Sequence, residues 1–275
     1  MSQLVTCFKP DSPALRSDRP LSDDEIRAVV PSIFGEDRHP NCSARYSYIP
    51  TAAVLSELRK EGFQPFMACQ TRVRREDRRE FTKHLLRLRH ASQINGGEAN
   101  EVVLINSHDG SSAYQMLSGR YVFVCENGLA CGDTFLDVRV PHKGDVAERV
   151  VEGAYEILQG FERVENSREA MRAVSLDTGE QEVFARAALS LRYDPEKPAP
   201  VSEGQLLEPR RIEDRGSDLW SVFNRCQEGL VKGGLEGRTA SGRRQRTRPV
   251  WGIDQNLKLN RALWMLAEEM RKLKA

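Results

Sequence analysis

Short runs of aliphatic residues alternate with turn dipeptides through residues 101–133. Val102–Ile105 form one such run. It is followed by Asp109-Gly110, a dipeptide favoured in tight hairpins because glycine readily adopts positive φ. A second run, Arg120–Cys125, ends at the similar dipeptide Asn127-Gly128. This pattern predicts an antiparallel β-meander.

Further strands and several helices are predicted around the meander. Ser22 followed by three acidic residues is typical of a helix start, because acids suit the positive end of the helix dipole. Apolar residues three or four apart predict a long helix after Asp145. The predicted helices lie near 22–30, 51–61, 145–161, 181–193, 218–231 and 254–273, with further strands at 63–71, 81–89 and 135–140. The layout predicts an α+β fold, in which helices pack an antiparallel meander of about five strands.

Composition shifts along the chain suggest three regions. Residues 1–20 are rich in proline and polar residues, which predicts a flexible N-terminal arm. Residues 21–175 hold the predicted strands and form the α+β domain. Residues 176–275 read as a helical C-terminal region, with an Arg/Gly-rich loop at 232–250.

The overall composition narrows the class of protein. The chain has 275 residues, of which 39% are hydrophobic and 29% charged, as expected for a globular protein with a real core. A net charge of +1 supplies no global basic field, so nucleic-acid binding would have to rest on local clustering. Neither a signal peptide nor a run of ~18 apolar residues is evident, which predicts a cytoplasmic protein without membrane contact.

The clearest candidate for function is the Arg/Gly-rich loop. Five arginines follow Glu236 with no acid among them, and glycines make the backbone permissive. Guanidinium groups bind phosphate oxygens through paired hydrogen bonds, and counterion release adds affinity. The candidate nucleic-acid-binding residues here are Lys232, Arg238, Arg243, Arg244, Arg246 and Arg248. The alternatives are a solvated interhelical loop and a loop that grips an acidic protein.

A second basic cluster lies on the strand predicted at 81–89. Leu86 and Leu88 alternate with Arg87 and Arg89, so the arginines are expected on the outer, solvent-facing side of a half-buried strand. A basic sheet face can track a nucleic-acid backbone. An ordinary solvated face with ion pairs is the competing interpretation.

A cluster of polar residues follows Val102–Ile105, the first apolar run of the meander. His108 and Asp109 have the chemistry of a proton-transfer pair, with Asn106, Ser111 and Ser112 available to hold a substrate. The same residues equally suit a structural turn, in which Asp109 shapes the backbone and Ser111 caps it. The structural interpretation is preferred, so no catalytic residue is assigned beyond the candidates His108 and Asp109.

The sequence predicts no metal site and no cofactor. His108, Cys125, Cys131, Asp133 and His142 match no familiar zinc spacing. The six cysteines lack a CxxC pair, which predicts free thiols rather than a disulfide framework. Trp251 follows the arginines directly and suits either base stacking or, more simply, an apolar contact at the start of the last helix.

Several segments carry a resemblance to a known family. They include Ile49–Arg74, the NSHDGSS run Asn106–Ser112, the VCENGLACG run Val124–Gly132 and the KLNRALWMLAE run Lys258–Glu268. In these segments the chain resembles the YfjQ/YafZ-type family of uncharacterised proteins found in prophages, plasmids and other mobile elements. The resemblance runs from Pro31 to the last helix. It implies a mobile-element protein, and it supplies neither an activity nor catalytic residues to transfer.

These observations together predict a non-enzymatic DNA-binding protein that acts in DNA maintenance or recombination. It would contact single strands or the phosphate backbone with little sequence readout, and covering a useful length of DNA would require a homo-oligomer. Two alternatives stay open. One is a nucleic-acid-processing enzyme with its site at His108 and Asp109, and the other is a protein-binding antagonist of host defence.

Overall fold

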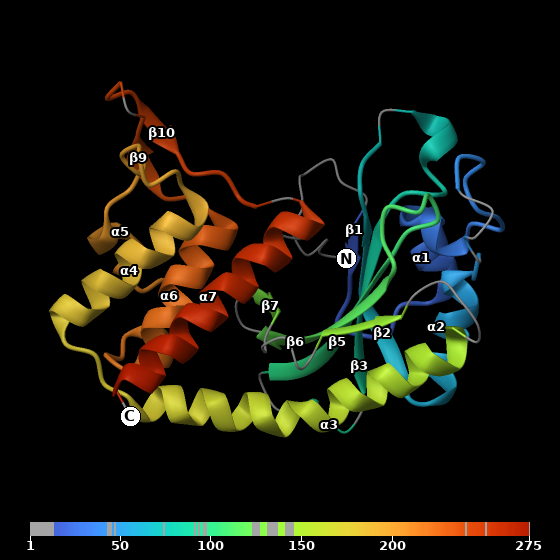
Figure 1. The fold of residues 1–275 in the computed structure, drawn as a ribbon, viewed down its shortest axis with the longest axis horizontal. Helices are drawn as coiled ribbons and strands as arrows, with labels where there is room; N and C mark the ends of the chain where they lie inside the picture. Colours follow the sequence, from blue (N-terminus) through green and yellow to red (C-terminus); the bar gives the residue numbers. More distant parts are fainter. Residues whose placement is uncertain are drawn as a thin grey trace. The chain divides into compact units, whose positions relative to one another are not determined.

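The computed structural model describes residues 14–42, 46, 48–73, 75–90, 92, 94–95, 98–122, 127–130, 137–140, 146–239, 241–250 and 252–274. The chain divides into two compact units, residues 1–161 and 162–275. The first contains an antiparallel sheet and the second is mainly helical, so the predicted α+β class with a helical C-terminal part is confirmed (Figure 1).

Among the described residues, unit 1 is built on an eight-stranded sheet with the main path β1-β2-β3-β5-β6-β7. Strand β4 pairs with β5, and β8 pairs with β6. Neighbouring strands on this path pair antiparallel, so the meander is confirmed and is longer than expected. The strands are β1 (Ala14–Arg16), β2 (Phe63–Gln70), β3 (His84–His90), β4 (Ile94–Asn95), β5 (Glu98–Asn106), β6 (Tyr114–Val122), β7 (Asn127–Ala130) and β8 (Asp137–Val140).

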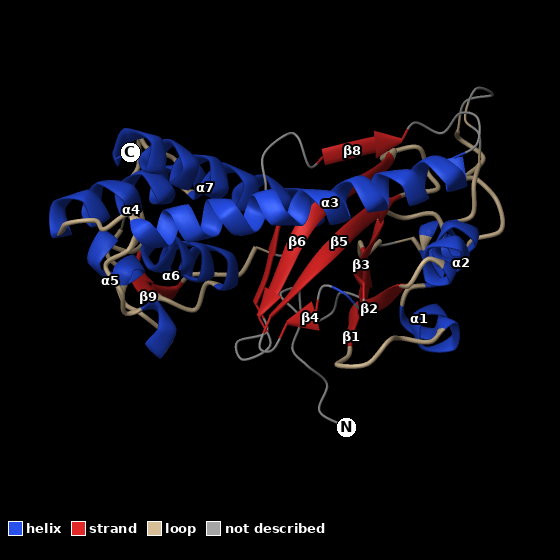
Figure 2. Cartoon of the chain, turned by 90° about the horizontal axis from the view of Figure 1, so that it is seen from below, coloured by secondary structure: helices blue, strands red, loops and turns tan. Residues whose placement is uncertain are grey.

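One face of the sheet packs against three α-helices and one short 3-10 helix. Leu86 pairs with Leu104, which pairs with Met116, so the strands present aligned apolar side chains on this face. Against them lie α1 (Asp23–Val29), the short helix η1 (Pro31–Phe34), α2 (Thr51–Lys60) and the first half of α3 (Val146–Ala173). Figure 2 shows α3 running over β5 and β6. The helix buries Val146, Val150, Ala154, Ile157 and Phe161, while Tyr155 and Leu158 of the predicted apolar pattern are only partly buried.

Three local expectations differ from the structure. Asn127-Gly128 is not a turn, because both residues lie in β7 and pair with Val122 and Tyr121. Gly110 has the expected positive φ of 76°, yet seven residues connect β5 to β6 instead of a tight hairpin. Residues 14–16, part of the arm expected to be flexible, form the edge strand β1 against β2.

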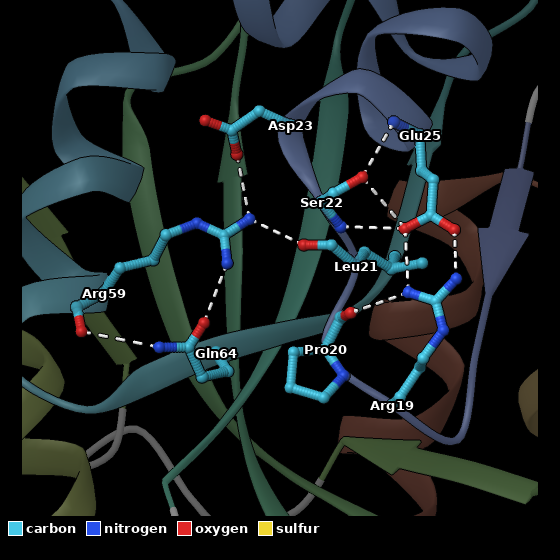
Figure 3. Close-up of polar contacts among 8 residues, drawn as sticks. All are labelled: Arg19, Pro20, Leu21, Ser22, Asp23, Glu25, Arg59 and Gln64. Atoms are coloured by element: carbon cyan, nitrogen blue, oxygen red, sulfur yellow. Dashed lines mark hydrogen bonds and ion pairs between the residues drawn. The ribbon is translucent and has the colours of Figure 1, made fainter.

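A polar network defines the start of α1 (Figure 3). Ser22 and Glu25 form a reciprocal capping box, in which each side chain accepts a hydrogen bond from the other's backbone N–H. Arg19 donates to the Glu25 carboxylate, and this bond together with the capping bonds lowers the pKa of Glu25 to about 2. From α2, Arg59 donates to the carbonyl of Leu21 at 2.6 Å and to Asp23 at 2.8 Å. The network therefore joins α1 to α2 and β2.

Unit 2 is a helical assembly with a two-stranded hairpin. Its elements are α4 (Thr178–Arg192), α5 (Glu203–Leu207), the short helix η5 (Ile212–Asp214), α6 (Leu219–Lys232), β9 (Glu236–Arg238), β10 (Arg244–Arg246) and α7 (Ile253–Lys274). Trp220, Phe223 and Trp264 pack ring against ring between α6 and α7. Beside them, Gln227 donates to Asn260 at 2.8 Å, so both buried amides are hydrogen-bonded.

Three of the cysteines lie in the described part of the chain. There, Cys42, Cys69 and Cys226 carry free thiols. Burial raises the pKa of Cys69 to about 12, because the thiolate would lose its hydration. Within the same residues, no helix is long and apolar enough to span a bilayer.

The close approach of α3 to the sheet gives a stability test at Gly153. A Cβ there would lie 2.4 Å from Met116 Cε and 2.8 Å from Val138 Cγ1. Gly153→Ala should therefore destabilise the protein by about 1–3 kcal/mol through overpacking, although alanine favours helices. The free energy of unfolding is measured by urea denaturation.

Gly204 in α5 is the matched control, because among the described residues nothing lies within 4 Å of its added Cβ. Gly204→Ala should be neutral or stabilise the protein by up to ~1 kcal/mol. Equal effects of the two substitutions would contradict the proposed close packing.

Candidate nucleic-acid interface

The Arg/Gly-rich segment forms an ordered hairpin, which corrects the expectation of a flexible loop. β9 and β10 pair antiparallel, with Arg244 opposite Arg238 and Arg246 opposite Glu236. Positive φ angles of 64°, 79° and 80° at Gly233, Gly234 and Gly242 allow the chain to enter the hairpin and reverse at its tip. At that tip, Thr239 and Arg243 exchange hydrogen bonds.

The base of this arginine hairpin (residues 233–248) is held by contacts within unit 2. Gly237 packs so closely on Pro200 that an added Cβ would lie 2.0 Å from the Pro200 carbonyl oxygen. The Arg238 N–H donates to that oxygen at 2.8 Å. From α4, Arg192 donates to the carbonyls of Leu230 and Arg248. The hairpin is therefore anchored by main-chain contacts, which leave its arginine side chains available.

The arginines of the hairpin are exposed. Within the described residues, none of the five forms an ion pair with a carboxylate: Arg238, Arg243, Arg244, Arg246 and Arg248. Lys232, predicted with them, differs because it pairs with Glu228 at 3.1 Å inside α6. An isolated exposed cation is ordinary, whereas five on one hairpin create a strongly positive surface.

The strand register brings two of these charges directly together. Arg238 and Arg244 are cross-strand partners, and like charges directly opposite one another destabilise a strand pair. Arg238 donates to the carbonyl of Gly242 at 3.0 Å, a neutral acceptor that leaves its charge uncompensated. A bound anion would relieve this repulsion. The hairpin therefore has the electrostatics of an anion-binding surface.

A groove lies beside the arginine hairpin. Its volume is about 1220 Å³, and it is lined by the end of α4, the segment 193–202, the start of α5 and both hairpin strands. Arg238, Arg244 and Arg246 contribute to its lining. All of these residues belong to unit 2.

The expectation that Arg87 and Arg89 face solvent is wrong. Their exposed fractions are 6% and 2%, and both pair with Glu101, which is fully buried. Arg87 Nη1 lies 2.8 Å from one carboxylate oxygen and Arg89 Nε 2.9 Å from the other. The Arg89 guanidinium also lies 4.3 Å from the ring centre of Phe66. The sheet face predicted as basic and solvated is therefore a second buried layer.

A buried polar cluster joins α2 to β3, β5 and β6 at Thr51. Asn106 Nδ2 donates to the Thr51 hydroxyl at 2.9 Å. That hydroxyl lies 2.9 Å from His84 Nε2, while His84 Nδ1 lies 3.1 Å from the carbonyl of Thr82. A carbonyl only accepts, so Nδ1 carries the proton of a neutral ring and Thr51 donates to Nε2. Burial lowers the pKa of His84 to about 3, so it is a poor base near neutral pH.

His108 and Asp109, adjacent in sequence, have different surroundings. The His108 ring is fully buried, 5.2 Å from the ring of His84 and 5.0 Å from that of Tyr48. Asp109 is exposed and accepts the Ser111 N–H at 2.9 Å. Burial raises the pKa of Asp109, but hydrogen bonds from Ser111 outweigh it and lower the pKa overall. Asp109 thus shapes the turn, while His108 packs in the interior.

Neither Thr51, expected only as a helix start, nor His84 was predicted from the sequence as part of a polar site. His84 pairs with Asn106 across β3 and β5, a neighbour relation that only the strand register reveals. Among the residues described, no three His, Cys, Asp or Glu side chains group as a metal site. Cys125, Cys131, Asp133, His142 and Trp251 lie outside the described residues.

Comparison with known proteins defines the family. Residues 38–264 match the model named Domain of unknown function (DUF932), so the chain belongs to this uncharacterised family. It is 56% identical over 256 residues to UPF0380 protein YfjQ of Escherichia coli K12. It is 55% identical over 256 residues to UPF0380 protein YafZ of the same strain. Each alignment covers 93% of both chains, and no solved structure matches.

The ion pairs at Glu101 give a stability test. Glu101→Gln keeps the side-chain shape but leaves two buried guanidinium groups without their carboxylate. Breaking a buried ion pair costs about 3–5 kcal/mol, so the free energy of unfolding in urea should fall by that order. Glu76→Gln, at an exposed pair with Arg79, should change it by less than ~1 kcal/mol. Similar losses in both variants would contradict the assigned burial.

His84 should remain neutral in mildly acidic solution. Its pKa of about 3 in the folded protein lies below the ordinary 6.5, so its contribution to stability is complete above 6.5 and is lost as pH falls toward 3. Nitrogen–proton correlation spectra near pH 5 should show the His84 ring neutral and protonated at Nδ1. His84→Gln should remove that signal. A charged His84 ring at this pH would contradict the assignment.

Proposed function

We propose that the protein is a non-enzymatic nucleic-acid-binding protein that holds the phosphate backbone with its arginine hairpin. The observation that carries this proposal is the set of five exposed hairpin arginines without a carboxylate partner among the described residues. Phosphate oxygens suit such donors, because one guanidinium can give two parallel hydrogen bonds. Backbone contacts position a protein on nucleic acid without reading its sequence.

The anchoring of the hairpin supports binding over an ordinary solvated loop. The strand pairing and the contacts to Pro200 already order the backbone, so an incoming strand meets charges on a preformed support. The repulsion between Arg238 and Arg244 gives an anion a further advantage. A role in DNA maintenance or recombination is part of this proposal.

The two other predicted sites lend less support to a function at the surface. Arg87 and Arg89 are buried against Glu101, so backbone binding is proposed without them. The fully buried ring of His108 offers no access to a substrate. The nucleic-acid-binding residues proposed are therefore those of the hairpin.

Replacing Arg243, Arg244 and Arg246 together by Ala should weaken binding with little change in stability. Each lost phosphate contact reduces the slope of log K against log salt by roughly 0.7–0.9, so the slope should become shallower by about two. Exposed charges contribute only ~0–1 kcal/mol each to folding. Fluorescence anisotropy with labelled single- and double-stranded DNA and RNA, across a salt series, measures the effect.

The matched control removes three exposed arginines elsewhere in unit 2: Arg163, Arg172 and Arg215. This variant has the same net charge and should keep most of the affinity and the salt slope. A hairpin variant that binds like wild type would place the phosphate contacts elsewhere. Wild-type protein that binds no nucleic acid at low salt would overturn the proposal and make an acidic protein the better partner for these arginines.

A further inference from the structure

The lining of the groove beside the arginine hairpin is partly apolar and partly charged. Besides Arg238, Arg244 and Arg246, its lining includes Leu189, Tyr193, Pro200 and Val201. A site that binds only phosphate needs no apolar surface. Ligand sites that recognise a larger molecule are typically apolar clefts with a few placed polar groups. The groove therefore suits a ligand with both a flat apolar part and an anionic part.

Tyr193 is the aromatic residue of this lining, and it is held in place. It caps the end of α4, with its N–H donating to the Leu189 carbonyl at 2.9 Å. The Arg192 guanidinium lies 5.3 Å from its ring centre and is itself bonded to the carbonyls of Leu230 and Arg248. Tyr193 is half-buried and lines the groove. Tyr193 is thus a supported stacking surface beside the hairpin.

Some charged side chains around the groove form ion pairs within the protein, and others do not. Asp194 pairs with Lys197 at 2.9 Å, and Glu203 pairs with Arg186 at 2.9 Å. Within each of these pairs the two charges neutralise each other. The described residues supply no ion pair for the three arginines of the hairpin strands. Glu236 of β9, opposite Arg246, also lines the groove, so the two strands carry three arginines against one carboxylate and are net positive.

We propose that this groove takes a single-stranded nucleic acid, with a base against Tyr193 and the adjoining phosphates on Arg238, Arg244 and Arg246. This inference rests on the proposed backbone binding and specifies its ligand. A paired base has both faces covered by its neighbours, whereas a single strand offers a free face to an aromatic side chain. Every base has such a face, so the site would accept different sequences.

The test compares two probes that carry the same charge. One is a fluorescein-labelled oligothymidylate, and the other is an abasic strand of equal length, with a sugar–phosphate backbone and no bases. Base–aromatic stacking strengthens binding by roughly 5- to 150-fold per base, so wild type should bind the oligothymidylate at least ~5-fold more tightly. Tyr193→Ala should bring the oligothymidylate down to the abasic level and leave abasic binding unchanged. Tyr193→Phe should behave as wild type.

Unchanged abasic binding by Tyr193→Ala also shows that the variant is folded. Equal affinity of wild type for the two probes would overturn the groove site while leaving backbone binding in place. A Tyr193→Ala variant that retains the preference for bases would overturn it as well, and so would one that loses affinity for both probes alike. Failure of wild type to bind either probe would overturn backbone binding and the groove site together.

Discussion

The buried carboxylate of Glu101 is the interaction on which the arrangement of the sheet in unit 1 depends. It lies on β5 and holds two guanidinium groups of β3, one on each oxygen. Buried charges are tolerated only when they are paired and hydrogen-bonded. A shift of β3 against β5 by one residue would move both arginines to the opposite face and leave the carboxylate alone. Glu101 therefore specifies the register in which the apolar layers also align.

This ion-pair group also explains where the sequence interpretation of the sheet succeeded and where it failed. Alternation along residues 84–90 correctly separated Leu86 and Leu88 from Arg87 and Arg89. The step from alternation to solvent exposure was wrong, because both faces of the sheet are buried at β3 and β5. A signal was present in Val102–Ile105, whose four consecutive apolar residues are typical of a strand covered on both sides.

Helices were more predictable than turns, because their signals are local. The capping residue Ser22 and the apolar stripe of α3 are sequence signals that involve residues within one or two helical turns. Both features are observed in the structure. Asn127-Gly128 was misread because the same dipeptide is compatible with a strand once its neighbours pair. The polar cluster at Thr51 could not be predicted from the sequence. It joins Thr51 of α2 to residues of β3 and β5 that lie 33 and 55 positions further along the chain. No local sequence pattern predicts contacts between residues so far apart.

The polar groups of the two units illustrate opposite uses of the same chemistry. Around Thr51, buried donors and acceptors bond to one another, so their hydrogen bonds stabilise the fold. In the arginine hairpin the backbone is satisfied internally, and the charged side chains project from it.

The backbone hydrogen bonds of the arginine hairpin therefore stabilise its fold, whereas the described residues supply no carboxylate partner for its arginine side chains. Like charges face each other across its strands, an arrangement that costs stability unless an anion is present. This combination of an ordered backbone and unbalanced charge is the physical basis for proposing that the hairpin binds an anionic partner. The equally polar interior of unit 1, where each described bond closes on the protein itself, serves to hold the meander and its helices together.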